Sequence, residues 1–108
     1  MTELFKALSD ETRLRMVGLL ISGERCVCEI ETCLGLTQSN ASRHLNVLRS
    51  AGILASEKHA QWAYYHISEK FCTEHADLYS YLQTNFAAQE PYLSDGKRAA
   101  LTEKHETC

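Results

Sequence analysis

Polar and apolar positions follow a helical period between Thr37 and Gly52. Ala41, Leu45 and Leu48 recur at spacings of four and three, which places them on one buried stripe of a helix. Thr37 suits the N-cap of such a helix, and Gly52 suits the left-handed position just past its end. The pattern therefore predicts a short amphipathic helix with one buried face and one polar face.

The polar face of this helix carries short side chains that both donate and accept hydrogen bonds. Glutamine and asparagine pair well with adenine, arginine pairs well with guanine, and serine reaches bases or phosphates. Such a face fits the major groove of double-stranded DNA. The residues that we assign to this contact are Gln38, Ser39, Asn40, Ser42, Arg43 and Asn46.

The segments on either side of this helix strengthen the DNA-binding interpretation. Residues 28–34 predict a second short helix closed by a glycine turn, so the pair forms a helix-turn-helix. Residues 53–58 and 62–67 are strand-like runs that predict a β-hairpin, and the second run is rich in aromatic residues. We expect a mainly α fold with a β-hairpin wing, a winged helix-turn-helix, in which Lys58 and His59 contact phosphates.

The outer segments predict helices that pair two copies of the chain. Ser9 is expected to cap a second helix from Asp10, and Ser68 to cap a long last helix over residues 69–89. The apolar stripe of that last helix exceeds what so small a core needs, which predicts a homodimer through the terminal helices. The predicted dimer contacts are Leu4, Phe5, Leu78, Leu82 and Phe86.

The length and charge of the chain limit its number of domains and its possible classes of function. A chain of 108 residues makes one domain, which we place at 1–90, with a flexible C-terminal tail over 91–108. The net charge of −3 argues against indiscriminate nucleic-acid binding, although residues 37–66 carry three cations against one anion. No signal peptide, membrane-spanning run, phosphate loop or catalytic triad is present, so we expect a cytoplasmic protein that is not an enzyme and has no membrane partner.

Five cysteines are many for a cytoplasmic chain of this size, and they indicate metal ligands or redox thiols. In an unbroken helix Cys26 and Cys28 would point about 200° apart, whereas in an extended segment they would lie on one side and share an ion. Cys33 lies about 7.5 Å from Cys28 along the axis and joins them only if the helix start is distorted or the chain doubles back. Ion binding is therefore expected to open the start of this helix.

Several motifs together resemble the ArsR/SmtB family. They are Leu8–Leu14, Cys26–Ile30, Gln38–Leu45, Leu48–Leu54 and the strand Trp62–Tyr65. The resemblance covers residues 3 to about 89. It implies a dimeric bacterial winged-helix repressor that leaves operator DNA when it binds a metal or metalloid ion.

The Cys26-Val27-Cys28 motif more narrowly resembles that of arsenite-sensing and cadmium/lead-sensing members. This resemblance implies Cys26 and Cys28 as ligands, with arsenite or antimonite as inducer, no constitutive cofactor, and other soft metal ions as alternatives. We add Cys33 as the candidate third ligand. A thiol-redox sensor of the same fold is a further alternative. Arsenite sensors of this type have a cysteine where this chain has Glu31, so the third ligand stays open between Cys33, Cys72, Cys108 and solvent.

Overall fold

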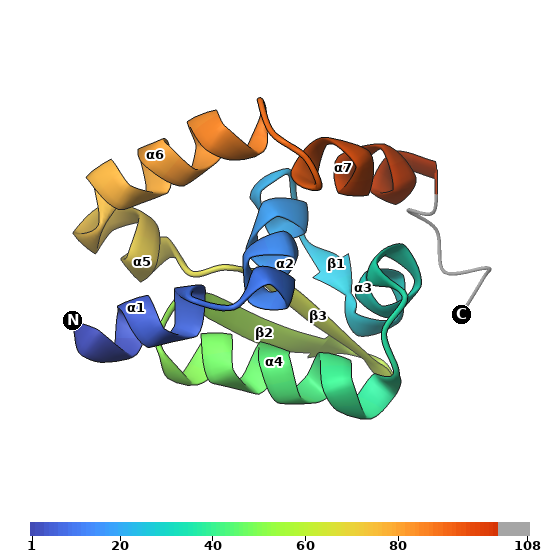
Figure 1. The fold of residues 1–108 in the computed structure, drawn as a ribbon. Coiled ribbons are helices and arrows are strands. Elements are labelled where there is room, and N and C mark those ends of the chain that lie inside the picture. The colour runs from blue at the N-terminus through green and yellow to red at the C-terminus, as the bar shows by residue number, and fades with distance from the viewer. Residues whose placement is uncertain (102–108) are drawn as a thin grey trace.

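The computed structural model describes residues 1–101, which form seven helices and three short strands (Figure 1). In chain order they are α1 (Thr2–Leu8), α2 (Glu11–Ile21), β1 (Arg25–Cys26), α3 (Val27–Leu34), α4 (Gln38–Ser50), β2 (Leu54–His59), β3 (Trp62–Ile67), α5 (Glu69–Glu74), α6 (Ala76–Phe86) and α7 (Tyr92–Leu101). Within this described part, no helix is both long and apolar enough to cross a bilayer.

Helices α3 and α4 form the predicted helix-turn-helix. Gly35 ends α3 in the left-handed conformation, with φ at 66°. Thr37 then caps α4, because its hydroxyl accepts a hydrogen bond from the backbone N–H of Asn40 at 3.2 Å. Gly52 has φ at 83° just past the helix, as its position predicted. The sequence predicted these two helices correctly because the capping residues and the spacing of the apolar residues indicate the same helix ends.

The wing is an antiparallel hairpin of β2 and β3, as predicted, and β1 adds a third strand. The strand order is β1-β3-β2, with Leu54 opposite Ile67 and His59 opposite Trp62. The sequence analysis did not predict β1 as a strand, because two residues are too short to show an alternating pattern. Its pairing of Cys26 with Tyr64 fixes the segment that leads into α3.

The core lies around α2, which occupies the centre of the molecule (Figure 1). Figure 1 shows α4 and the sheet on one side of this helix and α6 and α7 on the other. The predicted stripe of α4 is confirmed, because Ala41, Leu45 and Leu48 are completely buried. Burial of this stripe holds α4 against the core, which leaves the polar face of the helix outward.

Two predicted helix boundaries are wrong. Ser9 is the C-cap of α1, and Asp10 is the N-cap of α2, where its carboxylate accepts from the N–H of Arg13 at 3.1 Å. The predicted long last helix is two helices, which meet at His75 with φ −127° and ψ 47°. Ser68 does cap α5 as expected, with Phe71 N–H donating to its hydroxyl.

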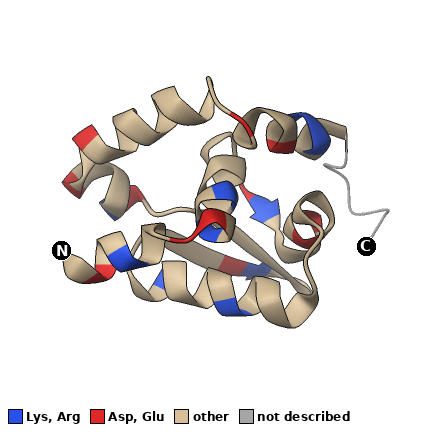
Figure 2. Cartoon of the chain, in the orientation of Figure 1, with Lys and Arg blue, Asp and Glu red and all other residues tan. Residues whose placement is uncertain are grey.

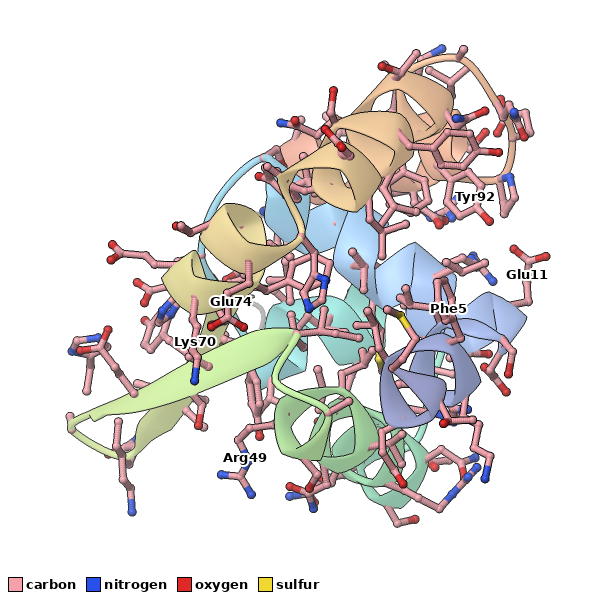
Figure 3. All side chains as sticks on the ribbon, turned by 90° about the vertical axis from the view of Figure 1, so that its left-hand side faces the viewer. Phe5, Glu11, Arg49, Lys70, Glu74 and Tyr92 are labelled. Atoms are coloured by element: carbon pink, nitrogen blue, oxygen red, sulfur yellow. The ribbon has the colours of Figure 1, made fainter. Side chains whose placement is uncertain are left out.

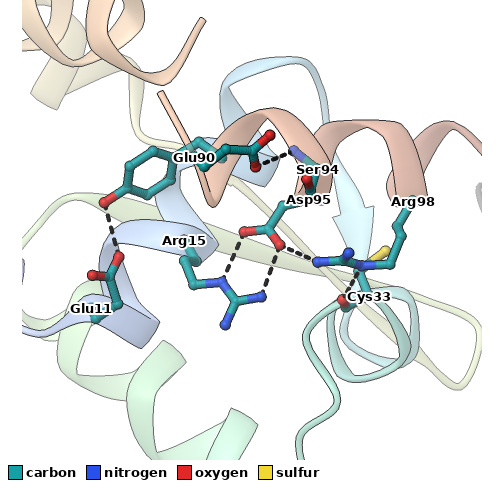
Figure 4. Close-up of polar contacts among 8 residues, drawn as sticks. Glu11, Arg15, Cys33, Glu90, Ser94, Asp95 and Arg98 are labelled. Atoms are coloured by element: carbon teal, nitrogen blue, oxygen red, sulfur yellow. Dashed lines mark hydrogen bonds and ion pairs between the residues drawn. The ribbon is translucent and has the colours of Figure 1, made fainter. Parts of the chain in front are cut away.

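Helix α7 occupies residues for which the sequence predicted a flexible tail. Asp95 at its centre is 1% exposed and accepts two hydrogen bonds from Arg15 of α2, at 2.8 and 2.9 Å. Arg98 of the same helix contacts the same carboxylate (Figure 4). Ala99 is also buried. The polar composition of residues 91–101 concealed this helix, because its buried contacts include charged side chains.

Candidate metalloid site and DNA-binding face

Cys26 and Cys28 lie together at the start of α3, with their Sγ atoms 2.8 Å apart. Cys26 is the N-cap residue and has extended geometry, with φ −80° and ψ 156°. Its side chain therefore leaves the backbone before the helix begins, which allows it to meet that of Cys28. The expectation that the helix start must open before the two sulfurs converge is wrong, because Cys26 already lies outside the helix.

Glu29 fixes the backbone at this pair of cysteines. Its carboxylate accepts a hydrogen bond from the N–H of Cys26 at 3.0 Å, so that the two residues form a capping box. The Glu29 side chain is buried, and Arg25 Nη1 lies 3.8 Å from its Oε2. Sequence reasoning missed this role, although the three-residue spacing from Cys26 to Glu29 is that of a capping box with cysteine in place of serine.

Tyr64 is the residue of β3 that lies opposite Cys26. Burial raises the pKa of Tyr64, and the nearby Cys26, Glu29 and Glu24 raise it further. The phenol is therefore neutral at physiological pH and adds no competing charge beside the cysteines. Cys26 itself is completely buried, so an ion held by this pair would be shielded from solvent on the Cys26 side.

The structure does not bring Cys33 to this pair. Within residues 1–101, the only three His, Cys, Asp or Glu side chains whose ligand atoms all lie within 4.8 Å of one another are Glu24, Glu57 and His59, which are exposed. Cys33 instead packs in the hydrophobic core and is 4% exposed. The unbroken helix α3 directs Cys33 to the interior, and its role as a ligand beside Cys26 and Cys28 stays a prediction.

The remaining two cysteines have different positions. Cys72 is half-buried in α5, and burial of Tyr79, with a further contribution from Cys72, raises the pKa of that tyrosine. Cys108 lies outside the described residues. Neither the sequence nor the described structure brings Cys72 to the pair at the start of α3.

The polar face of α4 is exposed over its whole length. Gln38, Ser39, Asn40, Arg43 and Asn46 are exposed, and Ser42 is half-exposed. The predicted phosphate contacts of the wing, Lys58 and His59, are exposed as well. Lys and Arg positions follow α4 and β2 on the lower side of the molecule (Figure 2). The residues predicted to contact DNA therefore share an accessible, locally cationic region.

A hollow of about 500 Å³ joins the cysteine pair to this region. Cys28 and Glu31 line it from α3, Gln38 and Ser42 from α4, and Lys58 from β2. An ion on Cys28 would therefore lie beside side chains that we predict to contact DNA. This proximity could not be seen in the sequence, because it depends on how α3, α4 and the wing pack.

The predicted dimer contacts divide into two groups. Leu4, Leu82 and Phe86 are buried within the single chain, at 5%, 6% and 9% exposure, and have little surface left for a second copy. Phe5 is 52% exposed and lies on the face shown in Figure 3. Leu78 is partly buried and lines a hollow with Phe5 between α1 and α6. Leu82 and Phe86 of α6 thus pack against the subunit's own core, and the part of this stripe in a dimer interface stays a prediction.

Comparison with known proteins identifies the fold and the family. Residues 10–56 match the family described as bacterial regulatory protein, arsR family. The chain is 39% identical over 94 residues to the arsenic resistance transcriptional regulator ArsR2 of Pseudomonas putida, a match that covers 86% of this chain and 79% of the relative. The chain belongs to the ArsR family.

Two further ArsR-family proteins support this assignment. The arsenical resistance operon repressor of Escherichia coli is 48% identical over 67 residues, which cover 61% of this chain but only 57% of that protein. The crystal structure of the transcriptional repressor BigR from Xylella fastidiosa is 36% identical, covers 82% of this chain and 85% of that one, and superposes with a TM-score of 0.69. The ArsR-family fold is a winged helix of DNA-binding regulators, not of enzymes.

Proposed function

We propose that this chain is a transcriptional repressor that binds operator DNA as a homodimer and releases it when trivalent arsenic or antimony binds Cys26 and Cys28. The observation that best supports this proposal is that the Sγ atoms of Cys26 and Cys28 lie 2.8 Å apart. Cys28 also lines a hollow whose wall includes Gln38 and Ser42 of α4. The names of the relatives from Pseudomonas putida and Escherichia coli support arsenic over other inducers.

The donor set suits a soft ion. Thiolates favour soft metals and metalloids over magnesium or calcium, which prefer oxygen ligands. A trivalent arsenic ion takes two or three sulfur ligands, so two converging cysteines are enough to begin binding. The chemistry of the pair also admits cadmium and lead, which makes these ions the necessary comparison in any titration.

DNA release follows from the position of the pair. Helix α3 packs directly against α4, and the backbone N–H of Cys26 is part of the cap that fixes the start of α3. An ion bound to both sulfurs changes this cap and occupies space next to Gln38 and Ser42 of α4. A coupling free energy of about 1–3 kcal/mol per site is typical of allosteric proteins, and a dimer has two sites.

The test is release of the native promoter fragment, titrated with arsenite, antimonite, cadmium, lead and zinc. We expect arsenite and antimonite to release DNA at the lowest concentrations. Cys26→Ser and Cys28→Ser should each bind DNA nearly as well as the wild type but should no longer respond, because a hydroxyl keeps the size and removes the soft ligand. Cys72→Ser is the matched control and should still respond.

Two outcomes would contradict the proposal. If Cys26→Ser and Cys28→Ser release DNA at the wild-type arsenite concentration, the sensing site lies elsewhere in the chain. If peroxide releases DNA with a mass shift on Cys28 while arsenite has no effect, the protein is a thiol-redox sensor of the same fold.

A further inference from the structure

His44 lies at the edge of the polar face of α4, and each nitrogen of its ring has an arginine beside it. Nδ1 is 3.1 Å from Nη1 of Arg13, which belongs to α2. Nε2 is 3.3 Å from Nη2 of Arg43, the exposed residue that precedes His44 in α4. The side chain of His44 is only 7% exposed, so the ring is held between the core and the outer surface of the helix.

Arg13 fixes the inner side of this ring. Its Nε donates to the backbone oxygen of Ala7 at 2.7 Å, and its Nη2 donates to that of Lys6 at 3.3 Å. Both oxygens belong to the end of α1, where a helix leaves carbonyl groups without a partner of its own. The guanidinium of Arg13 therefore has a fixed position, and its third contact is the one with His44.

The two arginines compete for one acceptor on His44. Arginine can only donate hydrogen bonds, and a neutral imidazole has one acceptor nitrogen and one N–H donor. The acceptor is Nδ1, because Arg13 is the closer of the two arginines and is held in place by the end of α1. Nε2 then carries the hydrogen. Residues 1–101 give this N–H no acceptor, since its polar neighbour among them is the Arg43 guanidinium.

Two donors therefore lie side by side at the surface of α4. Nε2 of His44 and Nη2 of Arg43 are 3.3 Å apart, which allows a single oxygen atom to accept from both at ordinary hydrogen-bond lengths. Arg43 and Arg13 place two positive charges around the ring, against the one negative charge of Asp10, which also caps α2. This balance favours an anionic acceptor.

The position of the donor pair on α4 suits a phosphate better than a base. His44 lies beside the buried stripe, about 40° from Leu48 around the helix, whereas Arg43 lies on the opposite, exposed side. A helix in the major groove turns its outer face toward the base edges. Its flanks then face the walls of the groove, where the phosphates are.

We infer that His44 contacts DNA directly, and that its Nε2–H and the Arg43 guanidinium together bind one phosphate oxygen of the operator backbone. This inference rests on the proposed function, because it requires that α4 binds operator DNA. The sequence does not indicate this role, since the helical period places His44 next to the buried stripe. The contact adds an uncharged donor to a DNA-binding face that carries few positive charges.

The test uses the full-length dimer and native promoter duplexes that each carry one methylphosphonate, which removes the charge of a single phosphate. At one phosphate, this change should weaken binding of the wild type about ten-fold, as expected for a hydrogen bond to a charged group. Arg43→Ala and His44→Ala should each lose most of this sensitivity. His44→Gln should keep it, because an amide offers both an acceptor for Arg13 and an N–H donor. Ser50→Ala, at an exposed site of the same helix, is the control and should keep it as well.

Nitrogen-15 NMR of the wild type tests the position of the hydrogen without a substitution, so the inference can be tested even if His44→Ala does not fold. Free protein should carry the hydrogen of His44 on Nε2. Its signal should shift when unmodified DNA is added, and should not shift with the duplex that is modified at the identified phosphate. A hydrogen on Nδ1 in the free and bound protein would overturn the inference.

The inference and the proposed function fail in different ways. If Arg43→Ala loses its sensitivity to one phosphate and folded His44→Ala keeps all of its sensitivity there, His44 makes no contact and this inference alone is overturned. If the methylphosphonate results are as expected but arsenite does not release the DNA, the contact of His44 is supported and the proposed inducer is wrong. If the wild type does not bind the promoter fragment, both are overturned.

Discussion

Arg13 of α2 donates a hydrogen bond through Nη1 to Nδ1 of His44 in α4, at 3.1 Å. The same guanidinium donates through Nε to the backbone oxygen of Ala7 at 2.7 Å, so it joins α1, α2 and α4. Arginine can only donate, and Nη2 of Arg43 lies 3.3 Å from the other ring nitrogen, Nε2. His44 can therefore accept a hydrogen bond from an arginine only while one ring nitrogen is unprotonated, in the neutral imidazole. Burial lowers the pKa of His44, and the positive charges of Arg43 and Arg13 lower it further.

Stability should therefore decrease in mild acid. The unfolded chain takes up a proton on His44 near its ordinary pKa of about 6.5, whereas the folded chain takes it up only at lower pH. The free energy of unfolding should be highest above about pH 6.5 and fall as the pH decreases toward the folded pKa. Urea unfolding at several pH values checks this. His44→Asn should remove the dependence, and His59→Asn, at an exposed site, should keep it.

Arg43 is expected to contribute to specific DNA binding. It is exposed on α4, and its Nη2 lies 3.4 Å from Oδ1 of Asn40, which aligns the guanidinium along the helix face. If Arg43 pairs with a guanine, Arg43→Ala should weaken operator binding by about 1–3 kcal/mol and relax specificity at one base position. Lys70→Ala removes an exposed charge on α5 and is the control. Fluorescence anisotropy over a salt series measures both.

An unchanged operator affinity and salt slope for a folded, dimeric Arg43→Ala variant would remove this residue from the interface. A loss that is uniform across DNA sequences, with a smaller salt slope, would instead indicate a phosphate contact.

Replacing Phe5 should weaken the dimer, whereas replacing Leu82 should destabilise the subunit itself. Phe5 is half-exposed in the single chain, so Phe5→Asp should leave the fold intact and weaken the dimer. Leu82 is 6% exposed, so Leu82→Glu should bury an unpaired charge and destabilise the subunit itself by several kcal/mol. Sedimentation and circular dichroism separate the two effects. Val47→Asp, at a comparably exposed site on α4, is the control and should stay dimeric.

One result would contradict the dimer assignment. If Phe5→Asp sediments as an intact dimer at micromolar concentration, then the face formed by α1 and α6 is not the interface.

The DNA-binding half of the fold was predictable because its signals are local. In α4 a capping residue, an apolar period and a terminal glycine occur within sixteen positions and agree with one another. The hairpin is similarly indicated by two strand-like runs of six residues. A segment can be predicted from a single sequence when its local conformational preferences agree with the tertiary structure, as they do here.

Helix α7 and the break at His75 were not predictable for the opposite reason. Asp95 is held by Arg15, eighty positions earlier, and no local pattern reports such a pair. The apolar residues before and after His75 continue one helical period, although the backbone turns there. The sequence indicated that Cys26 and Cys28 act together, but not that their side chains already meet. They meet because α3 begins one residue after Cys26, and the exact end of a helix is hard to predict from sequence.

Glu29 should be the residue on which the geometry of the cysteine pair most depends. Its buried carboxylate accepts the N–H of Cys26 at 3.0 Å. Glu29→Ala should therefore lower the free energy of unfolding by about 1–3 kcal/mol, the cost of a buried donor left without an acceptor. Glu29→Gln keeps an acceptor and should cost less, although it loses the charge beside Arg25 and at the helix N-terminus. Urea unfolding ranks the three proteins, and arsenite titration of each then shows whether a loosened cap changes ion binding. If Glu29→Ala is as stable as the wild type and binds arsenite equally well, the capping box does not determine the position of Cys26.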